Sequence, residues 1–421
     1  MARERLSGRC LWALLSLACL SLLGLAAACA GGGSGGRTSS ASPTPVPSPA
    51  FGLQSEVVAK ADHPAALAFT PDGRLLVAEQ FTGNIRVVAA DGKLLTDPFA
   101  HIDVADWLHL DWGLTGLAVD PDFAANHYVY AFYTELRPSD PSRPIGQPKL
   151  VRFTDKDGRG TDEKTIIANF PETQLDHQGF KANGRIHFGP DGFLYATVGN
   201  YDMSKALEPG GQPPTQDLSS LMGKMLRVSK ESGAAPEDNP FVGQTGADPR
   251  IFAYGFNQAS DFTFHPRTGG IYGSDNTDSC EELNLIKAGG NYGGIPVGAF
   301  PHPDCTSATQ VPGIYFLAVP GKKPGDFQSP VNTAAMTFVS GPRYPSLGDS
   351  LLLCEASTKL MKRLVLGAAD FSQVTSEGTV AYDCGRALAV SSDGTVYYGN
   401  DSQVRRLVPA KAQASSATPP P

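Results

Sequence analysis

The sequence predicts an all-β protein, a six-bladed β-propeller of four-stranded antiparallel blades. Three observations support this fold class. A strand–turn–strand phrase recurs six times, its copies lie about 50 to 76 residues apart, and helical periodicity is nearly absent after residue 30. A blade of four strands needs about 40 to 50 residues, so six copies account for the chain. A propeller is the simplest closed arrangement of such repeats.

Each copy has an apolar strand end, a tight turn of the Pro-Asp-Gly kind and a strand of alternating apolar residues. Asp and Gly suit these turns because they tolerate left-handed backbone angles. The copies are, in order, Ala68–Glu79, Ala118–Tyr133, His187–Asn200, Thr263–Asn276, Thr337–Glu355 and Val390–Asp401. Three intervals are longer than a blade requires, and we expect the extra residues to form loops on one face. The alternative is a common turn that recurs by chance in another all-β fold.

Composition narrows the class of protein further. The chain has 421 residues, with 46 Gly, 34 Pro and 41% hydrophobic residues, which suits one large all-β domain. The formal net charge is −8 and no basic stripe is present, so the sequence argues against nucleic-acid binding.

The N-terminus has the pattern of an export signal. Basic residues precede an apolar stretch that ends in the small residues LAAAC, which is similar to a bacterial lipoprotein box with Cys29 as the lipidated residue. Cleavage near Ala28 and an uncleaved anchor are the alternatives. We expect an extracytoplasmic protein of the bacterial cell envelope, bound to the membrane only through this lipid. The predicted segments are a signal peptide at 1–28, a Gly/Ser/Pro-rich tether at 29–50, the propeller at 51–410 and a disordered tail at 411–421.

The propeller region contains four cysteines, and an even number in an exported protein suggests disulfides. We favour the pairs Cys280–Cys305 and Cys354–Cys384 because they close the shorter loops. Sequence alone does not fix this connectivity. No CxxC or His-rich spacing indicates zinc or haem.

Several longer phrases resemble the soluble glucose/sorbosone dehydrogenase family and together span about residues 55 to 408. The resembling phrases are GRLLVAEQFTGNIRVV from residue 73, GLTGLAVDPDFAANHYVYAFYT from 113, NGRIHFGPDGFLYATVGN from 183, GKMLRV from 223, APEDNPF from 235, AYGF from 253 and EELNLIKAGGNYGG from 281. Members of this family are six-bladed propellers that bind pyrroloquinoline quinone and calcium on one face.

The resemblance implies hydride transfer from an aldose or aldehyde hydrate to pyrroloquinoline quinone, with electrons passed to an external acceptor. A His acts as the general base that removes the sugar C1 hydroxyl proton. His177, in the phrase LDHQGFKANGRIHFGPDG, is the candidate base. It lies several residues earlier than the family position, where an ungapped match puts Lys181. Either a short insertion follows an intact His177, or the base has been lost.

The resemblance also implies which residues contact substrate and quinone. Asn257 stands where the family has an Arg beside the reacting centre, and an amide donates hydrogen bonds without a full charge. Gln258 follows it as a cofactor-binding candidate. Arg386 matches the second of two cofactor-binding Arg residues, and Cys384 falls on the first. Lys359 lies near the quinone-binding Lys, and Asp111 falls where a polar side chain contacts the ligand. Ordinary loop and surface charges are the competing interpretation of the charged candidates.

For calcium, Glu282 and Tyr292 match a family carboxylate and a nearby Tyr ligand. Calcium prefers several oxygen ligands, both carboxylate and carbonyl. A buried structural carboxylate is the alternative for Glu282.

Two other functions stay open at this point. The chain could be a non-catalytic propeller that binds a ligand or a protein after loss of the quinone site, which the changes at Asn257, Lys181 and Cys384 favour. It could also be a calcium-dependent hydrolase on the same scaffold, although no matching set of Glu, Asn and Asp ligands is found by spacing.

Overall fold

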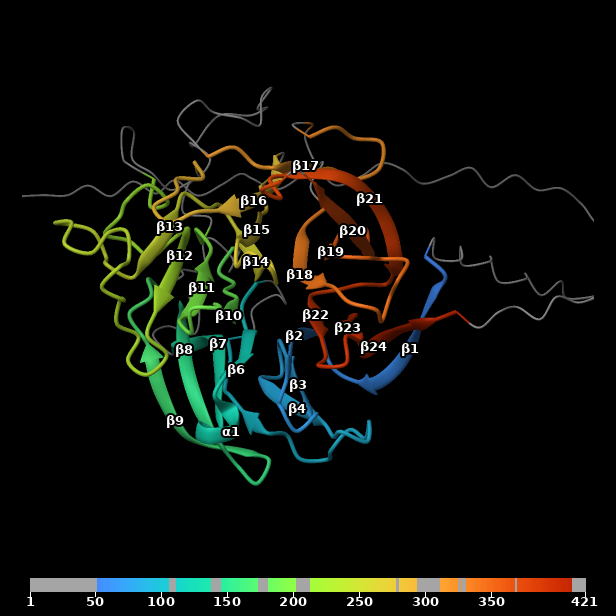
Figure 1. The fold of residues 1–421 in the computed structure, drawn as a ribbon. Coiled ribbons are helices and arrows are strands. Elements are labelled where there is room, and N and C mark those ends of the chain that lie inside the picture. Colours follow the sequence, from blue (N-terminus) through green and yellow to red (C-terminus); the bar gives the residue numbers. More distant parts are fainter. Residues whose placement is uncertain are drawn as a thin grey trace, which may run out of the picture. The chain divides into compact units, whose positions relative to one another are not determined.

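In a computed structural model of the chain, six four-stranded antiparallel sheets form a propeller (Figure 1). The fold class predicted from the sequence is therefore confirmed. The described residues are 51–105, 111–137, 145–172, 181–201, 213–277, 280–293, 311–324, 326, 331–367 and 369–410. Within them, no helix has the length and apolar character needed to cross a bilayer.

Each of the first three blades runs outward from an inner strand in chain order. Blade 1 contains β2 (Pro64–Phe69), β3 (Leu75–Glu79), β4 (Asn84–Val88) and β5 (Ala100–His101). Blade 2 contains β6 (Leu114–Val119), β7 (Tyr128–Arg137), β8 (Ile145–Lys156) and β9 (Arg159–Ile167), with the short helix α1 (Phe123–Asn126) before β7. Blade 3 contains β10 (Ile186–Phe188), β11 (Leu194–Val198), β12 (Lys224–Val228) and β13 (Ile251–Tyr254).

The last three blades follow the same order, except that the sixth takes one strand from the start of the chain. Blade 4 contains β14 (Ala259–Phe264), β15 (Ile271–Asp275), β16 (Glu281–Ile286) and β17 (Tyr315–Leu317). Blade 5 contains β18 (Thr333–Val339), β19 (Ser350–Glu355), β20 (Leu360–Gly367) and β21 (Gln373–Tyr382). Blade 6 contains β22 (Ala387–Val390), β23 (Val396–Gly399), β24 (Gln403–Pro409) and, at its outer edge, β1 (Leu53–Lys60).

The six repeats predicted from the sequence are the six inner hairpins, from β2–β3 to β22–β23. Their turns contain glycines with positive φ, such as Gly73 at 88° and Gly192 at 80°, as the turn type requires. The inner strands of neighbouring blades contact one another at five of the six interfaces, and between blades 3 and 4 the inner strand β14 contacts β11. We call the end of the ring where the inner strands begin the upper end, and the opposite end the lower end.

Apolar side chains fill the space between every two neighbouring blades. Six clusters of buried hydrophobic residues occur, one at each blade interface; for example, Tyr130 and Phe132 of blade 2 share a cluster with Ile186 and Leu194 of blade 3. Each sheet is therefore covered on both faces, which explains why strands such as β3 and β11 are buried along their whole length.

The expectation that the extra loop length lies on one face is wrong for blade 3. The segment 199–223 joins β11 to β12 at the upper end, but the segment 229–250 joins β12 to β13 at the lower end. The reason is that antiparallel neighbours alternate in direction, so successive connections of one blade lie at opposite ends of its sheet.

Candidate functional site

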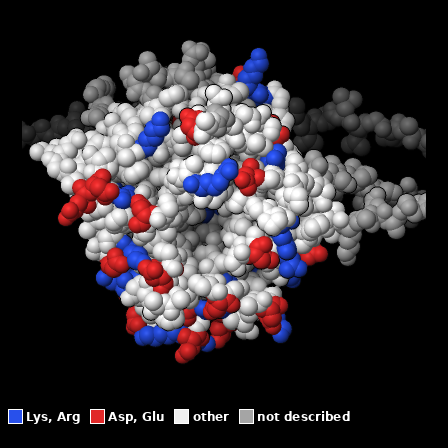
Figure 2. All heavy atoms as spheres, in the orientation of Figure 1, with Lys and Arg blue, Asp and Glu red and all other residues white. Residues whose placement is uncertain are grey.

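A central cavity of about 350 Å³ opens at the upper end of the ring. Figure 2 shows the surface hollowed where the six blades meet. Its lining comes mostly from residues directly before an inner strand or in the loop after a second strand, because these segments all meet at this end. The lining residues are Asp111, Asn183, Arg185, Gln258, Ser260, Asn276, Asn332, Thr333, Ala334, Ala356, Ser357 and Arg386.

Three of the residues that line the cavity have buried polar atoms without a hydrogen-bond partner in the described part of the chain. They are Asn183 Oδ1, Asn276 Oδ1 and Thr333 Oγ1. A buried polar atom without a partner costs about 1–3 kcal/mol. A ligand hydroxyl, a water molecule or a hard cation would satisfy the two amide oxygens, since both accept hydrogen bonds or coordinate metal.

A charged cluster occupies one side of the central cavity. The Oδ2 atom of Asp111 accepts hydrogen bonds from the backbone N–H of Lys181 (2.7 Å) and from Gln258 Nε2 (3.1 Å). The Oδ1 atom of Asp111 lies 3.4 Å from a terminal guanidinium nitrogen of Arg386. Asp111 precedes β6, Gln258 precedes β14 and Arg386 precedes β22, so the closed ring brings together residues up to 275 positions apart.

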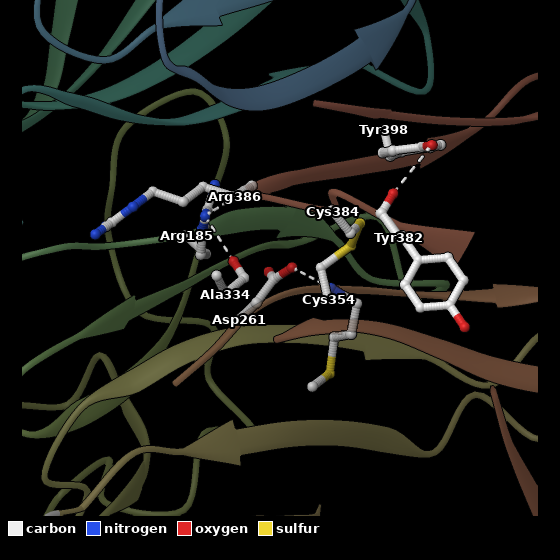
Figure 3. The surroundings of a disulfide bond; sticks show 9 residues. Arg185, Asp261, Ala334, Cys354, Tyr382, Cys384, Arg386 and Tyr398 are labelled. Atoms are coloured by element: carbon white, nitrogen blue, oxygen red, sulfur yellow. Dashed lines mark hydrogen bonds between the residues drawn. A yellow bond between two sulfur atoms is a disulfide. The ribbon is translucent and has the colours of Figure 1, made fainter. Parts of the chain in front are cut away.

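The floor of the central cavity is formed by Arg185, directly before β10. Its buried guanidinium donates hydrogen bonds to five backbone carbonyls, one from each of the other five blades. The acceptors are Ala65 O, Thr115 O (2.8 Å), Ser260 O (3.2 Å), Ala334 O (2.7 Å) and Arg386 O (2.7 Å). All five N–H groups of this side chain are thus used. Figure 3 shows Arg185 beside Arg386 and Ala334.

A disulfide supports the wall on the Arg386 side of the central cavity. Cys354 of β19 is bonded to Cys384, which lies two residues before Arg386 (Figure 3). Cys354 also lies just before Ala356 and Ser357 of the lining. The predicted pair Cys354–Cys384 is therefore present and joins blade 5 to the start of blade 6. Cys280 is disulfide-bonded too, but its predicted partner Cys305 lies outside the described residues.

Two residues predicted to contact substrate or quinone do not line the central cavity. Asn257 is buried, and its side chain accepts a hydrogen bond from Asn200 Nδ2 (2.7 Å) and donates one to Asn276 O (2.7 Å). Lys359 pairs with Asp401 at 3.1 Å, and its side chain is partly exposed. His177, the predicted base, lies outside the described residues.

Of the two predicted calcium residues, Glu282 lies in β16 of blade 4 and Tyr292 follows that strand; neither lines the central cavity. Glu282 is opposite Asp275 in the β15–β16 ladder, and it accepts a hydrogen bond from Asn284 Nδ2 (3.1 Å). Burial raises the pKa of Glu282 to about 8, and the negative charge of Asp275 adds to the rise. Burial also raises the pKa of Asp275 to about 7, against the hydrogen bonds from the backbone N–H groups of Asn257 and Gln258.

Tyr292, the other predicted calcium residue, uses its hydroxyl within the protein. It donates to Leu285 O (2.9 Å) and accepts from the backbone N–H of Lys287 (2.9 Å), while its ring stacks on Phe256. Among the described residues, no group of three or more His, Cys, Asp or Glu side chains could hold a metal ion. A calcium site that includes Glu282 would therefore need amide or carbonyl oxygens as well, and the calcium residues stay a prediction.

A family model described as Glucose / Sorbosone dehydrogenase matches residues 61–408. The chain belongs to the glucose/sorbosone dehydrogenase family. The aldose sugar dehydrogenase YliI of Escherichia coli (strain K12) is 26% identical over 364 residues, which cover 83% of this chain and 90% of the relative. Quinoprotein glucose dehydrogenase B of Acinetobacter calcoaceticus is 28% identical over 251 residues, 56% of this chain and 51% of the relative.

A solved structure agrees with the fold of this family member. The PQQ-bound form of an aldose sugar dehydrogenase from Streptomyces coelicolor has a TM-score of 0.62 with 21% identity. The match covers 85% of this chain and 99% of that one. At this identity the likeness supports the shared six-bladed fold alone.

Sequence reasoning found Asp111, Gln258 and Arg386 but missed most of the polar lining of this family member. Asn183, Asn276 and Thr333 were not predicted, nor was the part played by Arg185. The signal that was available is positional: Asn183 and Thr333 stand at or just before an inner strand, and Asn276 directly follows a second strand. In a propeller, polar residues at those positions point to the upper end.

Proposed function

We propose that this protein is an exported sugar dehydrogenase that transfers hydride from C1 of an aldose, or from an aldehyde hydrate, to pyrroloquinoline quinone with the help of calcium. An external acceptor would then take the electrons. Family membership and the aldose and glucose dehydrogenase relatives support the reaction class. The observation that carries the proposal is the central cavity, whose lining includes the cationic Arg386 and three residues with unpartnered buried oxygens.

The chemical groups that line the central cavity are of the types that bind a quinone and calcium. A volume of about 350 Å³ is within the range of cofactor sites. Arg386 offers a positive charge to a cofactor carboxylate, and Gln258 and Asn332 offer amide donors. The amide oxygens of Asn183 and Asn276 suit calcium or a sugar hydroxyl. The cavity supplies one exposed cation among the described lining residues, so binding of the anionic quinone should depend strongly on calcium.

When bound, the quinone supplies the hydride acceptor and calcium increases its electrophilicity. The chain orients the groups around it. Asp111 holds Arg386 and Gln258 on one side of the central cavity, so their donors need no reorganisation when an anionic or polar ligand enters. Arg185 closes the floor of the cavity, so a ligand enters from the upper end.

His177 would take the proton from the C1 hydroxyl as hydride leaves. Lys181, four residues later, is anchored to Asp111 through its backbone N–H. The backbone of Lys181 thus lies beside the charged cluster of the central cavity, four residues after His177 in the sequence. A neutral imidazole is well matched to this task because its ordinary pKa lies close to neutral pH.

The test is a titration of the full exported chain with pyrroloquinoline quinone, with and without calcium, followed by dye reduction over a panel of aldoses and aldehydes. We expect quinone binding that requires calcium and turnover that His177→Ala lowers by at least about 100-fold. The matched control is His101→Ala, which removes an exposed histidine of β5. Turnover that persists in His177→Ala would overturn His177 as the base.

A non-catalytic binding propeller is the second candidate. The observation that favours it is local: Asn257 has its side chain committed to Asn200 and Asn276, and Cys384 is in a disulfide, at two positions where the family carries Arg. Failure of the calcium-loaded protein to bind the quinone at micromolar concentration would support this candidate instead.

The lipid anchor is proposed separately from the reaction. The small residues before Cys29 and the Gly/Ser/Pro-rich segment after it support lipidation at that cysteine. Cys29→Ser should move the protein from the membrane fraction to the soluble fraction of expressing cells, and unchanged fractionation would contradict the anchor.

A further inference from the structure

A second cavity, which we call the lower cavity, lies between blades 4 and 5 and has a volume of about 250 Å³. Strands β14 and β18 begin at the central cavity and end at the lower one, at His265 and Val339. A strand of seven residues such as β18 spans about 23 Å, so the two cavities are separate. The sugar dehydrogenase reaction proposed above makes no use of this second space.

Aromatic rings form the walls of the lower cavity. The centroid of the His265 ring lies 4.5 Å from that of Phe371 and 4.9 Å from that of Phe338. Phe371 has a φ of 55°, a left-handed conformation that is costly for a large side chain. A hydrogen bond from the Tyr272 hydroxyl to Phe371 O (2.9 Å) helps to hold it there. The fold thus keeps an aromatic ring against His265 at a conformational cost.

Two polar groups of the lower cavity lack partners. Ser350 lines it and is 2% exposed, yet its hydroxyl makes no hydrogen bond to any described residue. The Nδ1 atom of His265 accepts from the backbone N–H groups of Arg267 and Thr268 (3.3 Å each), which leaves the ring proton on Nε2. Within the described residues no hydrogen bond reaches that Nε2. Ser350 and His265 therefore each bring a hydrogen-bond donor without a described partner to the lining of the lower cavity, next to aromatic rings.

Charge at the mouth of the lower cavity is balanced. Arg267 and Asp349 form a partly exposed ion pair at 3.5 Å, and the Arg267 guanidinium also lies over the Phe371 ring at 5.2 Å. Burial of the His265 ring and the nearby charge of Arg267 lower the pKa of His265, so the ring is neutral near pH 7. A site with no net charge and an apolar wall favours a neutral ligand.

We propose that the lower cavity is a second small-molecule site, which binds a neutral monocyclic aromatic compound that carries a carbonyl oxygen. The ring of the ligand packs against the aromatic lining of the cavity, which includes Phe338 and Phe371, and its oxygen accepts hydrogen bonds from Ser350 Oγ and His265 Nε2. This site is independent of the quinone and of sugar oxidation.

The probe for this site is 4-fluorobenzamide, followed by ¹⁹F NMR on the full exported chain, with 4-fluorotoluene as the analogue that lacks the oxygen. A probe of about ten heavy atoms should bind in about the millimolar range or tighter. We expect 4-fluorotoluene to bind about 2- to 10-fold more weakly, since it forms neither hydrogen bond.

Two variants locate the binding. Ser350→Ala should reduce the affinity for 4-fluorobenzamide by about 2- to 10-fold and leave that for 4-fluorotoluene unchanged. Phe371→Leu should weaken both probes, because it removes a ring contact. Ser232→Ala, an exposed serine between β12 and β13, is the matched control, and thermal unfolding of each variant reports whether it is folded.

Three results would overturn the proposal. Absence of 4-fluorobenzamide binding by the folded wild-type protein at millimolar concentration would mean that the cavity holds water only. Binding that is unchanged in both Ser350→Ala and Phe371→Leu would place the ligand elsewhere. Equal affinity for the two probes would show that the site does not recognise the carbonyl oxygen. If Phe371→Leu fails to fold, the Ser350→Ala comparison alone decides.

Discussion

Arg185 and Arg386 line the same cavity but have opposite environments. Arg185 is buried, and its five N–H groups all donate hydrogen bonds to carbonyls of the other five blades. The side chain of Arg386 is 41% exposed, and among the described residues its guanidinium makes a single ion pair, with Asp111 at 3.4 Å. Both guanidiniums stay charged, since arginine is not deprotonated in proteins.

The different environments of the two arginines distinguish a structural charge from a functional one in this fold. A buried cation whose donors are all satisfied has no capacity left for a ligand, and it stabilises the ring by joining its blades. A partly exposed cation with free donors, next to unpartnered amide oxygens, has the capacity to bind an anion. Residue type and location in the cavity do not distinguish the two arginines, whereas the number of occupied donors does.

The largest effect should come from Arg185→Met. The substitution leaves five buried carbonyls without a donor, and each such group costs about 1–3 kcal/mol. Their sum is comparable to the whole free energy of unfolding of a typical domain, about 5–15 kcal/mol. We therefore expect an insoluble or unfolded protein. Arg185→Lys, with three donors, should fold with a clearly lower melting temperature, as measured by circular dichroism. A melting temperature of Arg185→Met within a few degrees of wild type would show that Arg185 does not stabilise the ring.

A smaller loss of stability is expected for the double variant Cys354→Ala/Cys384→Ala. This disulfide closes a loop of 30 residues and is buried at the interface of blades 5 and 6. Its removal should lower the free energy of unfolding by about 2–4 kcal/mol in urea titrations. Because Arg386 follows Cys384 by two residues, quinone affinity should fall as well. Unchanged stability would mean that the packing around the two sites alone fixes this wall of the cavity.

The buried pair Asp275 and Glu282 should make stability depend on pH. Their pKa values in the folded protein, about 7 and about 8, are above the ordinary carboxyl range. At a pH between the ordinary carboxyl pKa and these raised values, the folded state holds more protons than the unfolded state. The free energy of unfolding should therefore fall as pH rises from about 5 to about 8, by at most about 1.4 kcal/mol per pH unit for each group. Urea titrations of the calcium-free protein test this, and Glu282→Gln should flatten the profile. Stability that rises over this range would contradict the expected direction.

The smallest effect on stability is expected for Arg386→Gln. A partly exposed substitution of this kind usually changes the free energy of unfolding by no more than about 0.5 kcal/mol. Its effect on function should be larger, with quinone affinity reduced by about tenfold, because a charged donor is replaced by a neutral one. Arg406→Gln, which removes a partly exposed arginine of β24 paired with Glu56, is the matched control. Equal quinone affinity in the two variants would show that Arg386 does not bind the quinone.

The sequence allowed the fold to be predicted because each inner hairpin is a local feature. Turn chemistry and alternation within phrases of 12 to 19 residues identified all six hairpins, and the disulfide Cys354–Cys384 followed from short loop closure. The part played by Arg185 was not predictable in this way. Its acceptors are 70 to 201 residues away along the chain, and they meet only when the ring is closed.

The candidate site was predictable where a family motif fixed the position, as for Asp111, Gln258 and Arg386. It was not predictable where packing decides the direction of a side chain. Asn257 follows the family phrase but turns to Asn200 and Asn276 behind the cavity wall. Asn183 and Asn276 have no unusual sequence context, and only their positions at the ends of strands bring them to the cavity.

Blade 6 is completed by β1, the first strand among the described residues, which pairs with β24, the last of them; Leu53 lies opposite Pro409. The ring therefore cannot close during synthesis, because its final partner is made last. Five blades can form from continuous stretches of chain, but the Arg386 carbonyl, directly before β22, reaches Arg185 only when blade 6 joins the ring. A chain that ends before Gln403 would leave β1 without its partner and the ring open, whatever the quality of the blades already made.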